Sequence, residues 1–211
     1  MPDYAALKEK VDKLVERDWD VPTFEARVRK LAAEGIPKKI LNPKEMLANK
    51  KQILDRVQLL GEEYTFVTKN CAQGPALALM EEFGLGNMEV IKALTPCPGV
   101  GGTGEICGGI TGSLIAFGLY FGSDVPLDPE AIDKTIRISQ RFMASFEGQI
   151  GHMYCADIIE KLILGHRLNP GESEAAMAAF AAEQGFEKCA LPPGIGVRLA
   201  AEIIIDSMSS C

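Results

Sequence analysis

Four cysteines far apart in the sequence are the residues of this chain best suited to chemistry: Cys71, Cys107, Cys155 and Cys189. Each lies at or near the start of an apolar stretch with helical spacing, and we expect Cys71 and Cys107 in the first turns of their helices. Free N–H groups and the positive end of the helix dipole lower the pKa of such a thiol, which favours the metal-binding thiolate. We therefore expect the four cysteines to form one sulfur-lined site.

The spacing of these cysteines excludes several familiar sites. No C-x-x-C pair is present, and the separations match neither a zinc finger nor a ferredoxin. Six cysteines in a chain whose start shows no secretion signal favour metal, cluster or redox chemistry over structural disulfides. Cysteine is also a common small buried residue, and we keep this simpler interpretation for Cys97 and for the terminal Cys211.

Composition predicts a globular protein of the cytoplasm. With 211 residues, of which 47% are hydrophobic, the chain can bury a full core without disulfides. A net charge of -7 gives no basic surface for nucleic acid, so we expect no nucleic-acid partner. The uncharged stretch 106–122 is shorter than the roughly 20 residues that a membrane span needs. We interpret it as a buried helix, in which Gly108 and Gly112 allow another backbone to approach, and we expect no membrane span.

Helical spacing dominates the pattern, and no alternating strand pattern competes with it. We expect helices at about 4–15, 24–34, 43–69, 71–83, 88–94, 107–122, 129–146, 153–164, 172–182 and 197–208. The fold class is therefore all-α, a compact multi-helix domain with a central glycine-rich buried helix. The charged, cysteine-free residues 1–60 are expected to form an N-terminal helical appendage on a four-cysteine domain at 61–211.

A glycine-rich loop precedes the second of the four cysteines. Residues 95–104 contain two prolines and four glycines, which exclude a helix or a central strand. The segment 99–104 fits G-x-G-x-x-G, but Pro96 and Pro98 interrupt the strand that a dinucleotide site requires. We expect this loop to wrap the sulfur site and to donate N–H groups to its sulfurs.

From residue 70 onward the chain resembles the redox-active C_GCAxxG_C_C family, a four-cysteine group with a CGAxxG motif that is also similar to part of split-Soret cytochrome c. The matching pieces are Asn70 to Gln73, the loop 99–104, Cys107 to Gly112, residues 146–155, and Cys189 before the last helix. The resemblance implies an iron–sulfur cluster, [2Fe-2S], held by Cys71, Cys107, Cys155 and Cys189. By analogy with these relatives, it also implies a homodimer.

The chain departs from this pattern in two respects. Gly109 stands where the motif has alanine, which adds backbone freedom beside Cys107. No C-x-x-C-H sequence is present, so we expect no covalent haem of the split-Soret type.

Three functions remain open at this point. The first is an intracellular, oxygen-sensitive iron–sulfur protein that transfers electrons to a partner protein or a small substrate. The second is a cluster-dependent oxidoreductase or Lewis-acid enzyme with a substrate pocket near the glycine-rich loop, for which Cys97, Glu105 and His152 are the candidate catalytic residues. His152 is expected on the same helical face as Cys155. The third is a thiol–disulfide or zinc-binding protein.

Overall fold

The computed structural model describes residues 2–210, which form helices joined by short loops with no β-strand among them. The elements are α1 (Tyr4–Val15), α2 (Val21–Glu34), α3 (Pro43–Ala48), α4 (Lys50–Thr68), α5 (Gln73–Phe83), α6 (Met88–Ala93), α7 (Gly99–Gly102), α8 (Gly108–Phe121), α9 (Pro129–Ile150), α10 (Cys155–Ile158), the π-helix η1 (Ile159–Ile163), α11 (Glu174–Ala182), α12 (Gly185–Lys188), α13 (Leu191–Ser207) and the 3₁₀ turn η2 (Met208–Ser210). The predicted all-α class is confirmed. Cys211 lies outside the described residues.

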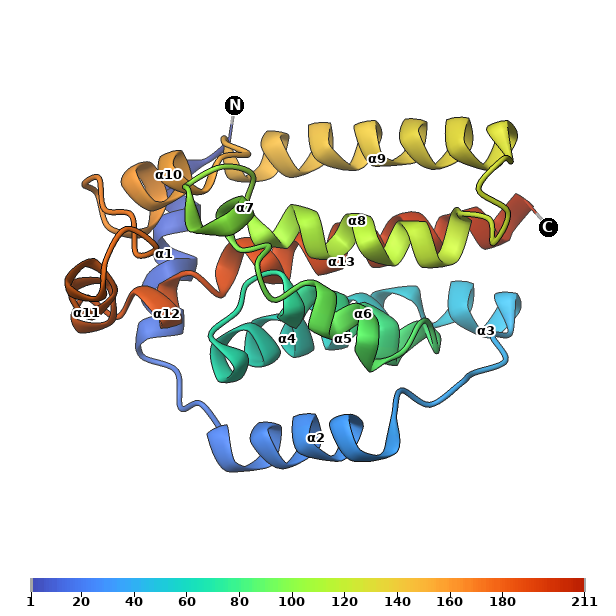
Figure 1. Cartoon of the computed structure of the whole chain (residues 1–211), viewed down its shortest axis with the longest axis horizontal. Helices are drawn as coiled ribbons and strands as arrows, with labels where there is room; N and C mark the ends of the chain where they lie inside the picture. The colour runs from blue at the N-terminus through green and yellow to red at the C-terminus, as the bar shows by residue number, and fades with distance from the viewer. Residues whose placement is uncertain (1, 211) are drawn as a thin grey trace.

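The core is built around α13, which packs against α4, α5, α8 and α9. Figure 1 shows the arrangement in layers: α9 lies along α8 and α13, α4 and α5 follow, and α2 covers the side opposite to α9. Ile110, Ala116 and Phe117 of α8 are fully buried, as expected for the central glycine-rich helix. No helix among the described residues is long and apolar enough to cross a membrane.

Helix starts follow the expected capping signals in several places. The side chains of Asn42, Asn87 and Asp128 cap α3, α6 and α9, each accepting hydrogen bonds from backbone N–H groups of the first turn. The helix expected from about residue 24 starts earlier, at Val21, because the Asp20 carboxylate caps α2 and accepts the N–H of Thr23.

Three other predicted helices differ from the observed ones. The helix expected over 43–69 is interrupted at Asn49, which ends α3 and precedes α4. The segment expected as one helix from 153 starts at Cys155 and continues as the π-helix η1. The last helix starts six residues early, at Leu191, because Pro192 and Pro193 occupy the first turn, where backbone N–H groups have no helical partner anyway.

Helix α4 runs through the boundary that we expected near residue 60. It packs along most of its length against α5 and α13, while α1 contacts α12, η1 and α13. The division into residues 1–60 and 61–211 remains a prediction, with α4 shared between the two parts.

A partly buried ion cluster joins the end of α1 to α4. The guanidinium of Arg17 lies 2.8 Å from a carboxylate oxygen of Glu62 and 2.6 Å from one of Glu63. These two glutamates are only 8% and 3% exposed, and burial raises the pKa of both. Oε2 of Glu63 is buried without a hydrogen-bond partner, so Arg17 is the main compensation for two adjacent buried carboxylates.

Replacing Arg17 by methionine should therefore destabilise the protein by about 3–5 kcal/mol at pH 7, because both carboxylates lose their cation. The loss should be smaller at pH 5. Carboxyl groups with a raised pKa in the folded state favour folding when protonated, and this stabilisation disappears as the pH rises through that pKa. Urea unfolding at the two pH values measures the effect. Lys13→Met, which removes an exposed pair with Glu9, is the control and should leave the stability nearly unchanged at both pH values. Equal losses in R17M at both pH values would contradict the interpretation.

Candidate functional site

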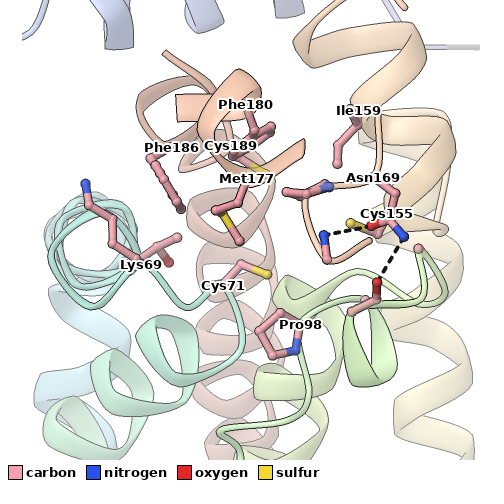
Figure 2. A pocket seen from close by; sticks show the side chains of 16 residues that line it. Lys69, Cys71, Pro98, Cys155, Ile159, Asn169, Met177, Phe180, Phe186 and Cys189 are labelled. Carbon is pink, nitrogen blue, oxygen red and sulfur yellow. Dashed lines mark hydrogen bonds between the residues drawn. The ribbon is translucent and has the colours of Figure 1, made fainter. Parts of the chain in front are cut away.

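Three of the four cysteines line a single cavity of about 200 Å³: Cys71, Cys155 and Cys189. Figure 2 shows that they belong to different segments: Cys71 to the turn before α5, Cys155 to the start of α10 and Cys189 to the end of α12. Cys107, the N-cap of α8, does not line the cavity but is buried nearby at 3% exposure. Its thiol lies within electrostatic reach of Cys71 and Cys155.

Burial dominates the electrostatics of these thiols. It raises the pKa of Cys71 to about 12 and that of Cys155 to about 11, and it raises the pKa of Cys107 and Cys189 well above the usual value. Backbone N–H groups of Gly108, near Cys71, and of Gly109, near Cys107, act in the opposite direction but do not outweigh burial. The expected lowering of thiol pKa is thus wrong for the metal-free chain.

The turn that carries Cys71 is fixed by the side chain of Asn70. Its carbonyl oxygen accepts the N–H groups of Ala72 and Gln73 at 3.1 and 3.0 Å. Its amide donates to the carbonyl of Thr95 at 3.1 Å. Cys71 therefore lies in the turn before α5 rather than in its first helical turn, and this turn is tied to the segment that follows α6.

Close packing of α8 explains why its first turns are rich in glycine. A Cβ atom at Gly108 would lie 2.4 Å from the sulfur of Cys71, and one at Gly112 would lie 2.3 Å from the carbonyl oxygen of Ala72. On another side, a Cβ atom at Gly109 would lie 3.0 Å from Cα of Pro193 in α13. The start of α8 is thus held between the Cys71 turn and the start of α13.

The substitution Gly108→Ala should destabilise the protein by about 1–3 kcal/mol, because the added methyl group overlaps the Cys71 turn. Gly118→Ala is a matched control on the same helix, where a Cβ atom meets nothing within 4 Å. It should stabilise by roughly 0.5–1 kcal/mol through helix propensity. Chemical denaturation of the metal-free proteins measures both changes, and equal stability of the two variants would refute this packing argument.

The glycine-rich loop lies directly beside Cys155. The N–H of Cys155 donates to the carbonyl of Glu105 at 2.7 Å, and that of Ala156 donates to Gly104 at 2.9 Å. Ile106 and Tyr154 form an isolated antiparallel bridge, which places the loop along the start of α10. Gly99 is close enough that a Cβ atom there would lie 3.5 Å from the Cys155 sulfur.

Two expectations about this loop have different outcomes. The loop does border the sulfur-lined cavity, through Gly99, Gly102 and Gly104. The N–H groups that approach sulfurs belong to the start of α8 instead, at Gly108, Gly109 and Ile110. Five of the six residues in the segment 99–104 have positive φ, and a distorted helical turn, α7, forms within it.

Strained backbone concentrates around this cavity. Among the described residues, only Lys69, Val100 and Gln184 combine a side chain with positive φ. Lys69 lines the cavity, Val100 lies between two of its glycines, and Gln184 is two residues before the lining residue Phe186. The π-helix η1 begins at Ile159, another lining residue. Such irregularities are frequent at functional sites.

The candidate catalytic residues Cys97, Glu105 and His152 are absent from the cavity wall. Cys97 is half-buried in the turn after α6, and Glu105 is exposed. His152 lies in the loop before α10, so it does not share a helical face with Cys155, and its ring centroid is 6.3 Å from that of Tyr4. No pattern in the sequence indicated the aromatic wall, which consists of Phe180 and Phe186 from α11 and α12.

The family model described as "Putative redox-active protein (C_GCAxxG_C_C)" matches residues 69–198, more than half of the chain and a range that includes all four cysteines. The chain belongs to this family. The resemblance seen in the cysteine pattern is confirmed, and with it a redox-active class of protein. Comparisons with curated proteins and with solved structures found no match.

Proposed function

We propose that this member of the redox-active family binds a [2Fe-2S] cluster through Cys71, Cys107, Cys155 and Cys189. The cluster would exchange single electrons with a partner protein or a small substrate. The observation that carries the proposal is the meeting of three family cysteines at one cavity, with the fourth buried within electrostatic reach. Because cysteine thiols stay reduced in the cytoplasm and remain free to bind iron there, we place the protein in that compartment.

The donor set suits this cluster better than a single metal ion. Thiolates are soft ligands that select iron–sulfur clusters or zinc. Among the residues that the structure describes, no three His, Cys, Asp or Glu side chains are grouped closely enough to hold one metal ion. A [2Fe-2S] cluster places only two of its four cysteines on each iron, so it matches sulfurs that are near one another without surrounding a single point.

The surroundings also favour a redox role. The cavity wall is mostly apolar, and backbone N–H groups at the start of α8 point to the sulfurs of Cys71 and Cys107. Hydrogen bonds to cluster sulfurs and limited access of water both tune reduction potential. The same burial disfavours free thiolates, so loading the site must release protons.

Anaerobic purification with iron and sulfide analysis, followed by electron paramagnetic resonance of the reduced protein, tests the proposal. We expect two iron and two sulfide per chain, the content that defines a [2Fe-2S] cluster. Protein that stays colourless and iron-free after anaerobic reconstitution would exclude the cluster. Stoichiometric zinc, or reversible cysteine pairs without iron in mass spectrometry, would favour the thiol or zinc function instead.

Individual serine substitutions at the four cysteines should abolish or strongly reduce cluster loading, because each removes a thiolate ligand. After the same iron loading and desalting, the wild type should also unfold at a higher temperature than the serine variants, since the free energy of cluster binding adds to folding stability. Cys97→Ser is the matched control, because Cys97 does not line the cavity. It should retain full iron content. Loss of iron in C97S together with retention in C189S would contradict the proposed ligand set.

A further inference from the structure

The cavity extends beyond the sulfurs to a wall of large apolar side chains. This wall is formed by Pro98, Ile159, Pro170, Met177, Phe180 and Phe186. Figure 2 shows Met177, Phe180 and Phe186 grouped with Cys189 on one side of the cavity, with Cys71 and Pro98 below and Cys155 opposite. The space is partly open, so a molecule that enters it can contact both the apolar wall and the sulfurs.

The polar residues of the lining offer little to a charged ligand. The amide of Asn169 is already used, because it donates to the carbonyl of Gly102 and accepts the N–H of Gly171. The hydroxyl of Thr65 has no hydrogen-bond partner, but it has almost no exposed surface, because it is buried against α5, where a Cβ atom at Gly74 would lie 2.4 Å from it.

The one charged residue of the lining, Lys69, is held at the rim. Its ammonium lies 3.4 Å from the ring centroid of Phe66 and 4.9 Å from that of Phe186. Figure 2 shows this ammonium directed away from the cysteines. Burial lowers the pKa of Lys69, which fits its position against two aromatic faces. The interior of the cavity is therefore almost entirely carbon and sulfur.

Size limits the ligand further. An apolar cavity of about 150 Å³ in a well-packed protein takes up benzene. The present cavity, at about 200 Å³ for the protein alone, is somewhat larger and has an aromatic wall in addition. A cluster held by Cys71, Cys155 and Cys189 would occupy the part beside the sulfurs, so the ligand would take the part beside the aromatic wall. Burial of a ring against such a wall is favoured by about 25 cal/mol for each Å² of apolar surface removed from water.

We propose that the cavity binds an uncharged, apolar small molecule of about the size of one aromatic ring, between the wall of Met177, Phe180 and Phe186 and the cysteine sulfurs. Ligand binding itself needs only the cavity. The assignment of this ligand as the class of small substrate for the redox site rests on the proposed function. Two strained elements hold the wall, the positive-φ residue Gln184 before Phe186 and the π-helix that starts at Ile159.

Fluorobenzene is a suitable probe, and its fluorine resonance reports both binding and distance from a paramagnetic centre. We expect saturable binding to the cluster-loaded protein, and additional broadening of the bound resonance when the cluster is reduced. Met177→Trp fills the cavity and should weaken binding by at least about tenfold. Met88→Trp on α6, a half-buried position away from the cavity, is the matched control and should bind as the wild type does.

Two outcomes overturn the inference: no saturable binding to either the metal-free or the cluster-loaded protein, or equal binding by M177W and M88W. Binding only to the metal-free protein would show that cluster and ligand compete for the cavity, and it would overturn the assignment of the ligand as a substrate of the redox site. If M177W does not fold, Phe186→Leu serves in its place and should weaken binding by removing the ring that faces the cavity. Protein that never binds iron refutes the proposed function alone. In that case, fluorobenzene titration of the metal-free protein and its M177W variant still decides whether the cavity takes an apolar ligand.

Discussion

The close approach of the first turn of α8 to the Cys71 turn is the contact on which the site depends. Gly108 and Gly112 leave no side chain between α8 and that turn, and Gly109 lets the start of α13 approach from another side. Cys107 caps α8 itself, and the segment just before it pairs with the start of α10, where Cys155 lies. Since Cys189 is next to the start of α13, one helix end brings four distant parts of the chain together.

Competition between burial and hydrogen bonding sets the chemical state of these sulfurs. Helix N-termini and free N–H groups favour thiolates, but the burial of Cys107 and the partial burial of Cys71 have the larger effect on their pKa values. The same apolar setting strengthens the hydrogen bonds once a charged group is present. A site of this kind is poorly suited to a free nucleophilic thiol. It is better suited to thiolates that bind a cation, because the cation displaces the thiol protons.

Local signals in the sequence were enough for the fold class and for most helix starts, because caps such as Asn42 and Asp128 act within a few residues. They also singled out the four cysteines as candidates, because each cysteine lies at or near the start of an apolar stretch with helical spacing. Local signals failed where tertiary packing decides. The π-helix at Ile159, the early start of α13 and the aromatic wall from Phe180 and Phe186 depend on contacts between distant segments. The error at His152 has the same origin, because the helix begins only at Cys155.

The accessibility of the sulfurs bears on the choice between electron transfer and substrate chemistry. A cluster sealed inside the protein exchanges electrons with partners only, whereas a small molecule must reach the sulfurs or iron directly. We expected a substrate pocket, if present, to involve Cys97, Glu105 and His152. The observed cavity instead opens between the Cys71 turn and the α11–α12 segment. Lys69 is the one acid or base other than the thiols in its described lining, and the Lys69 ammonium lies over the rings of Phe66 and Phe186, directed away from the cysteines (Figure 2). Proton donors close to the sulfurs are therefore limited to the thiols themselves. With the proposed cluster on these cysteines, an apolar ligand in this cavity would lie closer to an electron source than to a side-chain proton donor, which would favour single-electron chemistry over general acid–base catalysis.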